Sequence, residues 1–284
     1  DDTASIQAAI NSGHCIVLNP GLYRCTAPLL ITKPVHIKGD GSAWSGTPGT
    51  INATDFHGSW LYFDHSGVGV SISSTVYFSD IQFSHFGTVR NQPAPISGWA
   101  PNAHDYDFKM AHVSDVYFSH MLLLNPTKGI QMNMAGAGRL FVDHLKGQPL
   151  QVGINVDLAY DVCYFNTVHF WPFWADNTFV HAYTMTNLNG FLLGRCDNPH
   201  FSSIFTIFAR SGIAAYQNSY GAASKLHVIN ADFDRGSMGL WVQSSVTNGI
   251  TGQLVNISHQ GESGLAGSKG IVIQGNNSSI DITN

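Results

Sequence analysis

Hydrophobic and polar residues follow one pattern in the N-terminal stretch and another in the rest of the chain. Near the N-terminus, Ile6, Ala9 and Ile10 recur at helical spacing and share one face. Gly13 follows them and is suited to ending a helix. The pattern predicts a short amphipathic helix within residues 1–13.

Short apolar strands follow this predicted helix at once, over residues 16–24, 29–31 and 35–41. Asp2 or Thr3 can accept hydrogen bonds from the free amides of the first helical turn. We expect the helix to cover the open end of a stack of strands.

Four later segments align with one another, because in each an alternating strand reaches a polar residue at a bend and then resumes. They are residues 76–83, 116–123, 162–169 and 226–233. Their starts are 40, 46 and 64 residues apart. This spacing predicts about two coils of ~20 to 25 residues between copies, and about ten coils of ~4.8 Å in the chain. The polar residues at the bends predict a structural ladder inside the turn: Asp80, His120, Asn166 and Asn230.

The alignment also predicts which side chains point inward, because residues two apart on a strand share a face. If the pairs Ile81/Phe83 and Ala231/Phe233 are internal, the outward pairs are Gln82/Ser84, Leu122/Leu124 and Asp232/Asp234 and, if no bulge intervenes, Val168/Phe170. Outward apolar pairs should not face water. We expect a loop or neighbouring subunits to cover them.

Composition agrees with a rigid β protein of the extracellular type. The 284 residues include 29 glycines and 11 prolines, only 11% are charged, and Glu262 is the sole glutamate. Single β solenoids reach this length, so we expect residues 1–284 to form one all-β domain. The formal net charge of −5 provides no basic field for nucleic acid. No apolar run approaches the ~18 residues that span a bilayer, so no membrane insertion is expected.

The two ends of the sequence lead to separate expectations. Asp1 begins it without a signal peptide or initiator Met, as expected of a trimmed fragment or a processed product. The last apolar strands, 270–275 and 279–284, are followed by no recognisable cap, so we expect either more chain or another subunit to cover them.

The four cysteines indicate neither a metal site nor a disulfide framework. Cys15, Cys25, Cys163 and Cys196 are scattered and lack CxxC spacing. Cys15 and Cys25 flank one turn and could form a bridge; buried free thiols are the favoured alternative. No metal and no cofactor are predicted.

The N-terminal motifs resemble those of the pectate-lyase-like superfamily. In its phage tailspike β-helix domains, a D-x-T-x-x-I-Q-x-A-I helix precedes a V-x-L-P-x-G-x-Y strand pair. Here Asp1 to Ile10 and Val17 to Tyr23 match, with Asn19 in place of a small or apolar residue. The resemblance implies a right-handed single-stranded parallel β-helix with a capping N-terminal helix.

The same resemblance implies a protein of the virion tail that associates as a homotrimer, contacts other tail proteins and binds a bacterial surface polysaccharide such as capsule, O-antigen or exopolysaccharide. The Asn-Thr-Asp, Gly-His-Gly and Arg-Ile-Lys strings of polygalacturonases are missing, and no carboxylate cluster indicates the calcium of pectate lyases. Neither activity is expected.

Asp232 and Asp234 are the leading catalytic candidates, because two carboxylates lie on one face of a predicted strand. Their Cβ atoms would be ~6.5 to 7 Å apart, which suits the acid and the base or nucleophile of glycoside cleavage. Mutual repulsion would raise one pKa and hold the other down. Alternatively, one carboxylate pairs with Arg235 or caps the turn at 236–237.

Arg195 and Asp197 lie about one to two coils earlier and could reach the same groove, Asp197 as a third catalytic carboxylate and Arg195, like Arg235, as a substrate ligand. The alternative is a local turn before Pro199.

Two further segments are candidates for binding. Trp171 and Trp174 lie in an aromatic run around a proline and could present ring faces to sugars, or else fill an interface or a coil corner. The long insertion at 90–111, which contains Trp99 and the cluster at 104–107, could form a groove wall or a packed lid.

Three functions follow from these observations. The first is a tailspike-type protein that binds and depolymerises a polysaccharide by paired-Asp hydrolysis. The second is a structural or receptor-binding tail component without turnover. The third is a secreted polysaccharide lyase, in which a Tyr or His abstracts a proton beside a uronate neutralised by Arg195 or Arg235.

Overall fold

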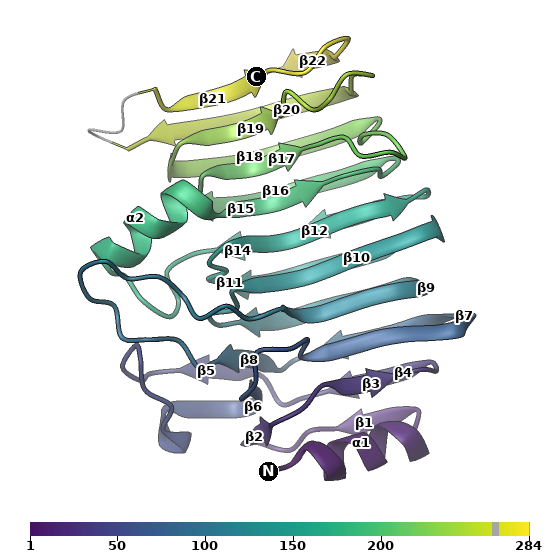
Figure 1. Cartoon of the computed structure of the whole chain (residues 1–284), viewed down its shortest axis with the longest axis vertical. Coiled ribbons are helices and arrows are strands. Elements are labelled where there is room, and N and C mark those ends of the chain that lie inside the picture. Colours follow the sequence, from purple (N-terminus) through teal and green to yellow (C-terminus); the bar gives the residue numbers. More distant parts are fainter. Residues whose placement is uncertain (263–266, 284) are drawn as a thin grey trace.

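Parallel strands stack on one another along the chain to form a right-handed β-helix (Figure 1). The computed structural model describes residues 1–262 and 267–283, and all their side chains except those of residues 134–137. Each coil passes through three strand positions in turn, which we call faces A, B and C. Neither helix of the described chain has the length and hydropathy needed to cross a membrane.

Face A consists of β3 (Leu29–Ile31), the first halves of β7 (Val70–Ser84) and β9 (Tyr106–Leu123), β10 (Lys128–Ala137), β12 (Val152–Ala159), β15 (Asn189–Leu193), β17 (Ser211–Ala215), β19 (Met238–Val242) and β21 (Lys269–Ile273). Face B consists of β1 (Cys15–Val17), β4 (Val35–Lys38), the later parts of β7 and β9, the first parts of β11 (Leu140–Gly147), β16 (Pro199–Ile207), β18 (Leu226–Gly236) and β20 (Thr251–Gly261), and β13 (Cys163–Asn166) and β22 (Ser279–Thr283).

Face C consists of β2 (Gly21–Cys25), β6 (Phe56–Phe63), β8 (Gly87–Arg90), β14 (His169–Phe170) and the last residues of β9, β11, β16, β18 and β20. The short strand β5 (Ser42–Trp44) pairs with β6 antiparallel, and a 3-10 turn (Ala53–Asp55) precedes β6.

The N-terminal helix α1 (Thr3–Ser12) covers the first coil, as predicted (Figure 1). Ile6 and Ile10 are buried in the interior cluster. The predicted cap is wrong in detail. The Asp1 carboxylate, rather than Asp2 or Thr3, accepts from the Thr3 amide at 3.1 Å, because the Asp2 carboxylate accepts from the Arg24 amide of β2 instead.

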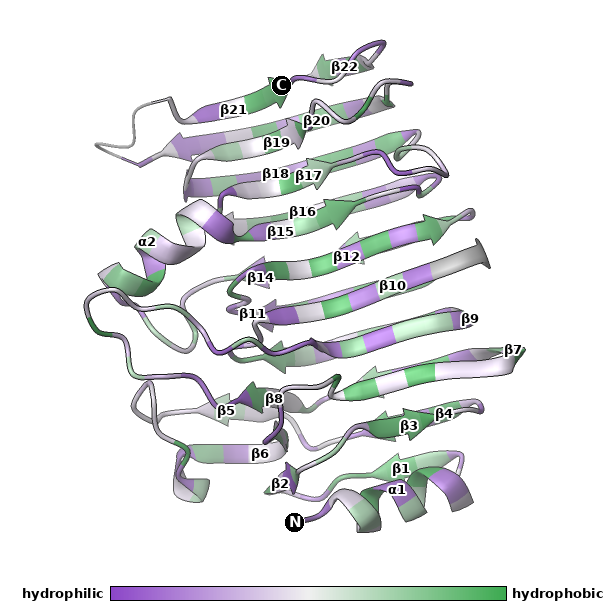
Figure 2. Cartoon of the chain, viewed as in Figure 1, coloured by the Kyte–Doolittle hydropathy of each residue, from purple (hydrophilic) through white to green (hydrophobic). Residues whose placement is uncertain are grey.

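Apolar and polar residues alternate along the strands (Figure 2), and the interior is filled by the inward set. The inward pairs Ile81/Phe83 and Ala231/Phe233 are buried, as predicted. Val168 and Phe170 are also internal, so their predicted outward direction is wrong. The left-handed bend residue is Thr167, with a φ of 51°, rather than Asn166, so the positions after it are shifted by one residue relative to the expected alignment.

A ladder of left-handed residues marks the bend between faces B and C. Its members have φ between 50° and 59° and are His85, His120, His144, Thr167, Ser203, Asn230 and Asn256. His120 and Asn230 therefore lie at the bend, as predicted, but their side chains are exposed rather than inside the turn, and Asn230 accepts from the Asn256 side chain. Asn166 precedes the bend residue Thr167, and Asp80 lies in a different column with Asp115.

The predicted coil spacing holds for two of the three intervals. Ile81 pairs directly with Val116, so one coil, enlarged by the loop 91–105, separates the first two copies. Later copies are two coils apart. The described part of face B contains ten strands, of which β1 is the first and β22 the last, in agreement with the expected number of coils.

The cysteines are free: Cys15 is exposed and the other three are buried. Burial raises the pKa of the Cys25 and Cys163 thiols to about 12. Because Cys15 and Cys25 are both free, the alternative without a bridge between them is the correct one.

A glycine column that the sequence analysis missed begins the face A strands. The repeated unit is glycine followed by Ile, Phe or Leu, at Gly129, Gly153, Gly190, Gly212, Gly239 and Gly270. A Cβ at Gly153 would lie 2.3 Å from the Gly190 carbonyl oxygen and 2.5 Å from the Phe170 ring. The column therefore lets successive coils approach closely.

We expect Gly153→Ala to lower the free energy of unfolding by about 1–3 kcal/mol, because the added methyl group overpacks two coils. The urea midpoint of unfolding measures the change. Gly270→Ala is the matched control, since the nearest atom to its Cβ, from His259, is 3.5 Å away. Equal midpoint shifts in the two variants would contradict the steric explanation.

Candidate functional site

The outward residues of face C bring three of the predicted site residues together. Asp232 pairs in register with Phe205 on one side and Ser258 on the other, and Asp234 pairs with Ile207 and Gln260. Phe205 in turn pairs with His169, and the Trp171 and Phe205 ring centroids are 5.9 Å apart. We call the residues His169, Trp171, Phe205, Asp232 and Asp234 the face C strip.

The aromatic part of the strip is accessible. Trp171 is 44% exposed, and Phe205 and His169 are half-buried. The rings of His169 and Phe205 meet edge to face, with centroids 4.9 Å apart. An exposed indole next to a half-buried phenyl ring provides the apolar surface that a sugar ring can contact.

Trp174 does not join this surface, so the predicted pair of exposed tryptophans is wrong. It is only 4% exposed, and its ring centroid lies 5.9 Å from that of Trp99 in the loop 91–105. Together with residues of α2 (Thr178–Asn187), these two tryptophans belong to a second apolar cluster outside the β-helix interior.

The second cluster also covers Leu122 and Leu124, which point outward as predicted. A loop and a helix of the same chain therefore bury this apolar pair. Of the two alternatives for the long insertion, a groove wall or a packed lid, the loop is the packed lid. It spans residues 91–105 rather than 90–111, because β8 continues to Arg90 and β9 begins at Tyr106.

Three members of the polar cluster predicted in that insertion, His104, Tyr106 and Asp107, are buried, whereas Asp105 is half-buried and pairs with Lys109. Arg90 and Asp107 have fully buried side chains, and the Arg90 Nε lies 2.7 Å from the Asp107 Oδ1. Arg90 also donates to the carbonyl oxygens of His65 and Tyr106. This network anchors the start of the lid and cannot reach a ligand on the surface.

The two carboxylates of the strip occupy different environments. Asp232 is exposed and accepts a short hydrogen bond from the Ser258 hydroxyl. Asp234 is half-buried. Its pKa is raised, first by burial and then by the charge of Asp232, while His259 acts in the opposite direction. Neither carboxylate belongs to an ion pair among the described residues.

Arg235 does not pair with either aspartate, so the first structural alternative for the pair is wrong. Its guanidinium pairs with Glu262, with Nε to Oε2 at 2.5 Å, and lies over the Phe208 ring at 4.9 Å. Arg235 has a φ of 47°, so the chain bends there and its side chain leaves the outward row of Asp232 and Asp234.

Arg195 and Asp197 lie at another corner of the coil, so they do not share a groove with the aspartate pair. They form a bidentate ion pair in the turn between β15 and β16, and Ser224 donates to Asp197 at 2.7 Å. Asp197 is in register with Ser224, whereas Asp232 follows only after the face B part of β18. The pair holds a turn, in line with the local alternative.

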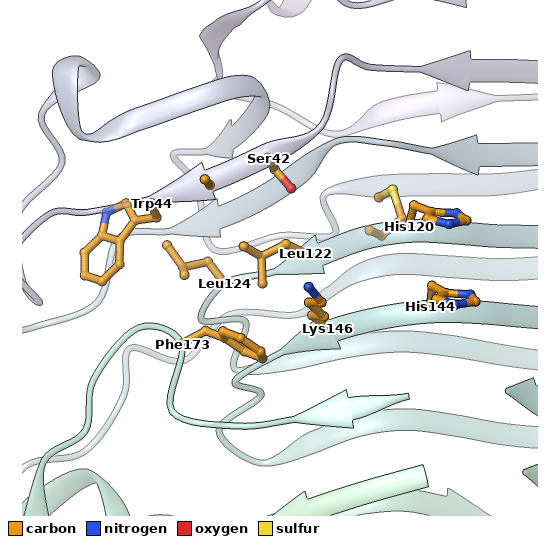
Figure 3. Close-up of a pocket in the computed structure, with 10 residues that line it drawn as sticks. Ser42, Trp44, His120, Leu122, Leu124, His144, Lys146 and Phe173 are labelled. Carbon is orange, nitrogen blue, oxygen red and sulfur yellow. The ribbon is translucent and has the colours of Figure 1, made fainter. Parts of the chain in front are cut away.

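A groove of about 380 Å³ lies at the N-terminal side of the strip (Figure 3). Its lining is Ser42, Ala43, Trp44, His120, Met121, Leu122, Leu124, His144, Lys146 and Phe173. This groove was not predicted from the sequence. Aligning Leu145–Gly147 with Met121–Leu123 would have placed Lys146 outward, but β5 and Phe173 join the groove only through the tertiary fold.

Face B carries a different aromatic arrangement. Tyr117, Phe141, Tyr164, His200 and His227 stack in successive coils, with centroids 4.5 to 5.7 Å apart. Because the ring faces lie against one another, mainly their edges are presented to solvent. The face C strip therefore differs in offering an exposed ring beside carboxylates.

The described residues contain no group of three or more His, Cys, Asp or Glu side chains that could hold a metal ion. What the strip can supply without a metal is a proton donor, a second carboxylate and an apolar contact surface.

Comparisons with known proteins find similarity in structure. No family model matches the chain, and no curated protein matches it. Tailspike protein 2 of Escherichia coli O157:H7 bacteriophage CAB120 is 14% identical with a TM-score of 0.47, over 99% of this chain and 40% of that one. The ORF18 protein of Geobacillus virus E2 is 12% identical with a TM-score of 0.49, over 100% of this chain and 58% of that one.

The catalytic unit of an alpha-1,3-glucanase from Streptomyces thermodiastaticus is 13% identical with a TM-score of 0.42, over 100% of this chain and 65% of that one. The chain thus spans about two fifths to two thirds of the length of these three proteins.

Proposed function

We propose that this protein binds a polysaccharide along face C and hydrolyses its glycosidic bonds with Asp232 and Asp234. The observation that carries the proposal is the position of two carboxylates without a cationic partner beside the exposed Trp171 ring and the half-buried Phe205 ring. The Asp197 carboxylate, by contrast, is held in a turn by its ion pair with Arg195.

In this mechanism Asp234 is the general acid. Burial and the charge of Asp232 favour its protonated form, as the raised pKa indicates. It donates its proton to the glycosidic oxygen as the bond to the anomeric carbon breaks. Asp232, oriented by the Ser258 hydroxyl, stabilises the positive charge at that carbon and either activates water or attacks the carbon directly.

The experiment that tests the proposal is mass spectrometry of soluble fragments after incubation with purified bacterial surface polysaccharides. Fragments that carry one added water support hydrolysis. Unsaturated fragments overturn it in favour of a lyase, and a polysaccharide that binds without fragments favours a receptor-binding or structural protein. Absence of binding to every capsule, O-antigen and exopolysaccharide tested would overturn the binding proposal as well.

The two tryptophans should respond differently to truncation. Trp171→Ala is expected to weaken polysaccharide binding by about tenfold with unchanged stability, because the exposed ring contributes contact rather than packing. Trp174→Ala is expected to cost about 3–5 kcal/mol of unfolding free energy. Isothermal titration and urea unfolding of both variants measure the two effects, and reversed roles would contradict the assignment.

We further propose that the chain works in a virion tail, as a homotrimer that contacts other tail proteins. The resemblance of residues 1–10 and 17–23 to tailspike β-helix domains supports this setting. Sedimentation equilibrium tests the trimer: a monomer at micromolar concentration would oppose it for this chain. Detection in culture medium without virions would favour the secreted alternative.

A further inference from the structure

The groove beside the strip contains a cation without a described partner. Lys146 projects from β11 toward Ser42, with Leu122 and Phe173 near its stem (Figure 3). It takes part in none of the ion pairs or side-chain hydrogen bonds described for the chain, whereas Arg24, Arg90, Arg139, Arg195 and Arg235 each pair with a carboxylate.

The walls of the groove supply no counter-charge to this ammonium group. No Asp or Glu lines it, and two histidines, His120 and His144, do. The carboxylate nearest to Lys146 in the sequence, that of Asp143, lies 2.9 Å from the His144 Nδ1 on the face B side of the bend. The remaining lining is largely apolar, with Trp44 and Phe173 as aromatic walls.

The groove is continuous with the strip. Lys146, His169, Phe205 and Asp232 are register neighbours in four successive coils and all point outward. At ~4.8 Å per coil, Lys146 lies about 14 Å from Asp232 along the solenoid axis. The Phe173 and His169 rings, with centroids 5.6 Å apart, bridge the groove and the strip. A chain bound along face C would therefore pass over both.

We propose that this groove is a subsite for an anionic sugar, with Lys146 binding the carboxylate of a uronic acid unit and Trp44 or Phe173 contacting the ring. The proposal rests on the proposed function and names its substrate class, an acidic polysaccharide. A lysine without a counter-charge in an apolar groove gains most from a ligand that carries the negative charge. A neutral sugar makes no use of it.

Glucuronate and glucose are the probes, compared by saturation-transfer NMR and titration on the full chain. The wild type should bind glucuronate about tenfold more tightly than glucose, and Lys146→Gln should remove the difference while leaving glucose unchanged. Lys38→Gln is the matched control, because Lys38 is an exposed lysine on face B. Glucose 6-phosphate tests whether the site selects a carboxylate or accepts another anion.

Equal binding of glucuronate and glucose by the wild type would overturn the inference, as would discrimination that survives in Lys146→Gln. Preference for glucose 6-phosphate over glucuronate would overturn the assignment of a uronic acid as the ligand of the groove. These outcomes are separable from failure of the proposed function, because the difference between glucuronate and glucose depends on the charge of Lys146 and requires no cleavage. It can be measured whether or not a polysaccharide is hydrolysed.

Discussion

Asp234→Asn is expected to reduce the rate of polysaccharide cleavage by at least ~100-fold while polysaccharide binding stays within about twofold of wild type. The amide is close in shape to the carboxyl group but cannot donate its proton to the glycosidic oxygen. Reducing-end release measures the rate, and titration of the inactive variant measures binding. Asp80→Asn is the control, since Asp80 is an exposed aspartate outside the strip.

Asp232→Asn should cause a loss of similar size, with a different pH signature. In the wild type, cleavage should fall as pH rises through the raised pKa of Asp234, because the acid then loses its proton. Asp232→Asn removes the like charge that helps to raise this pKa, so the alkaline limb of any residual activity should move to lower pH. Full activity in both variants would remove the pair from the mechanism.

Arg90→Met is expected to lower the free energy of unfolding by about 3–5 kcal/mol at neutral pH, because it leaves the Asp107 carboxylate buried without its cation. Urea unfolding measures the loss. Arg24→Met is the matched control. The Arg24–Asp64 pair is partly exposed, with Arg24 at 55%, so its loss should cost at most about 1 kcal/mol.

The cost of Arg90→Met should decrease toward acid pH. Burial already raises the pKa of Asp107, and Arg90 is the charge that opposes this rise. Without Arg90, the pKa of Asp107 in the folded protein lies further above its pKa in the unfolded chain. The variant therefore keeps its stability at pH values below the unfolded-state pKa and loses it as the pH rises through the folded-state pKa. A penalty that is the same at about pH 4 and pH 8 would contradict the buried charge as its cause.

The Arg90 network also matters for the strip, because it holds the lid that covers part of face C. The Asn125 side chain accepts from the Arg90 amide at 2.8 Å and donates to the Arg90 carbonyl, and Gln92 donates to Asn125 and Thr127. Trp99 of the lid then packs on Trp174. Loss of Arg90 should therefore loosen the segment that positions Trp171 and Phe173.

Local pattern was sufficient for the repeated coils and for the inward positions, whereas the right-handed parallel β-helix was implied by the resemblance of residues 1–10 and 17–23. Alternation along a strand depends only on neighbouring residues, so the inward positions Ile81, Phe83, Ala231 and Phe233 follow from the sequence. The same alternation placed Asp232 and Asp234 on one outward face. The helical spacing of Ile6 and Ile10 likewise predicted α1. Helix α2 was not predicted, although Asn177 accepts from the Phe179 amide as an N-cap.

Contacts between coils were decided by the tertiary structure, because loops of different length set which residues become register neighbours. The segment that contains α2 lengthens one coil and brings Trp174 against Trp99, which leaves Trp171 exposed alone. Phe205 becomes the neighbour of Asp232 only through pairing of β16 with β18. The aromatic walls beside Lys146 come from Trp44 of β5, about a hundred residues earlier in the chain, and from Phe173, one coil later. By itself the sequence determined the coil and the direction of each strand's side chains, since these are local; the tertiary structure alone decided which side chains from different coils share a surface.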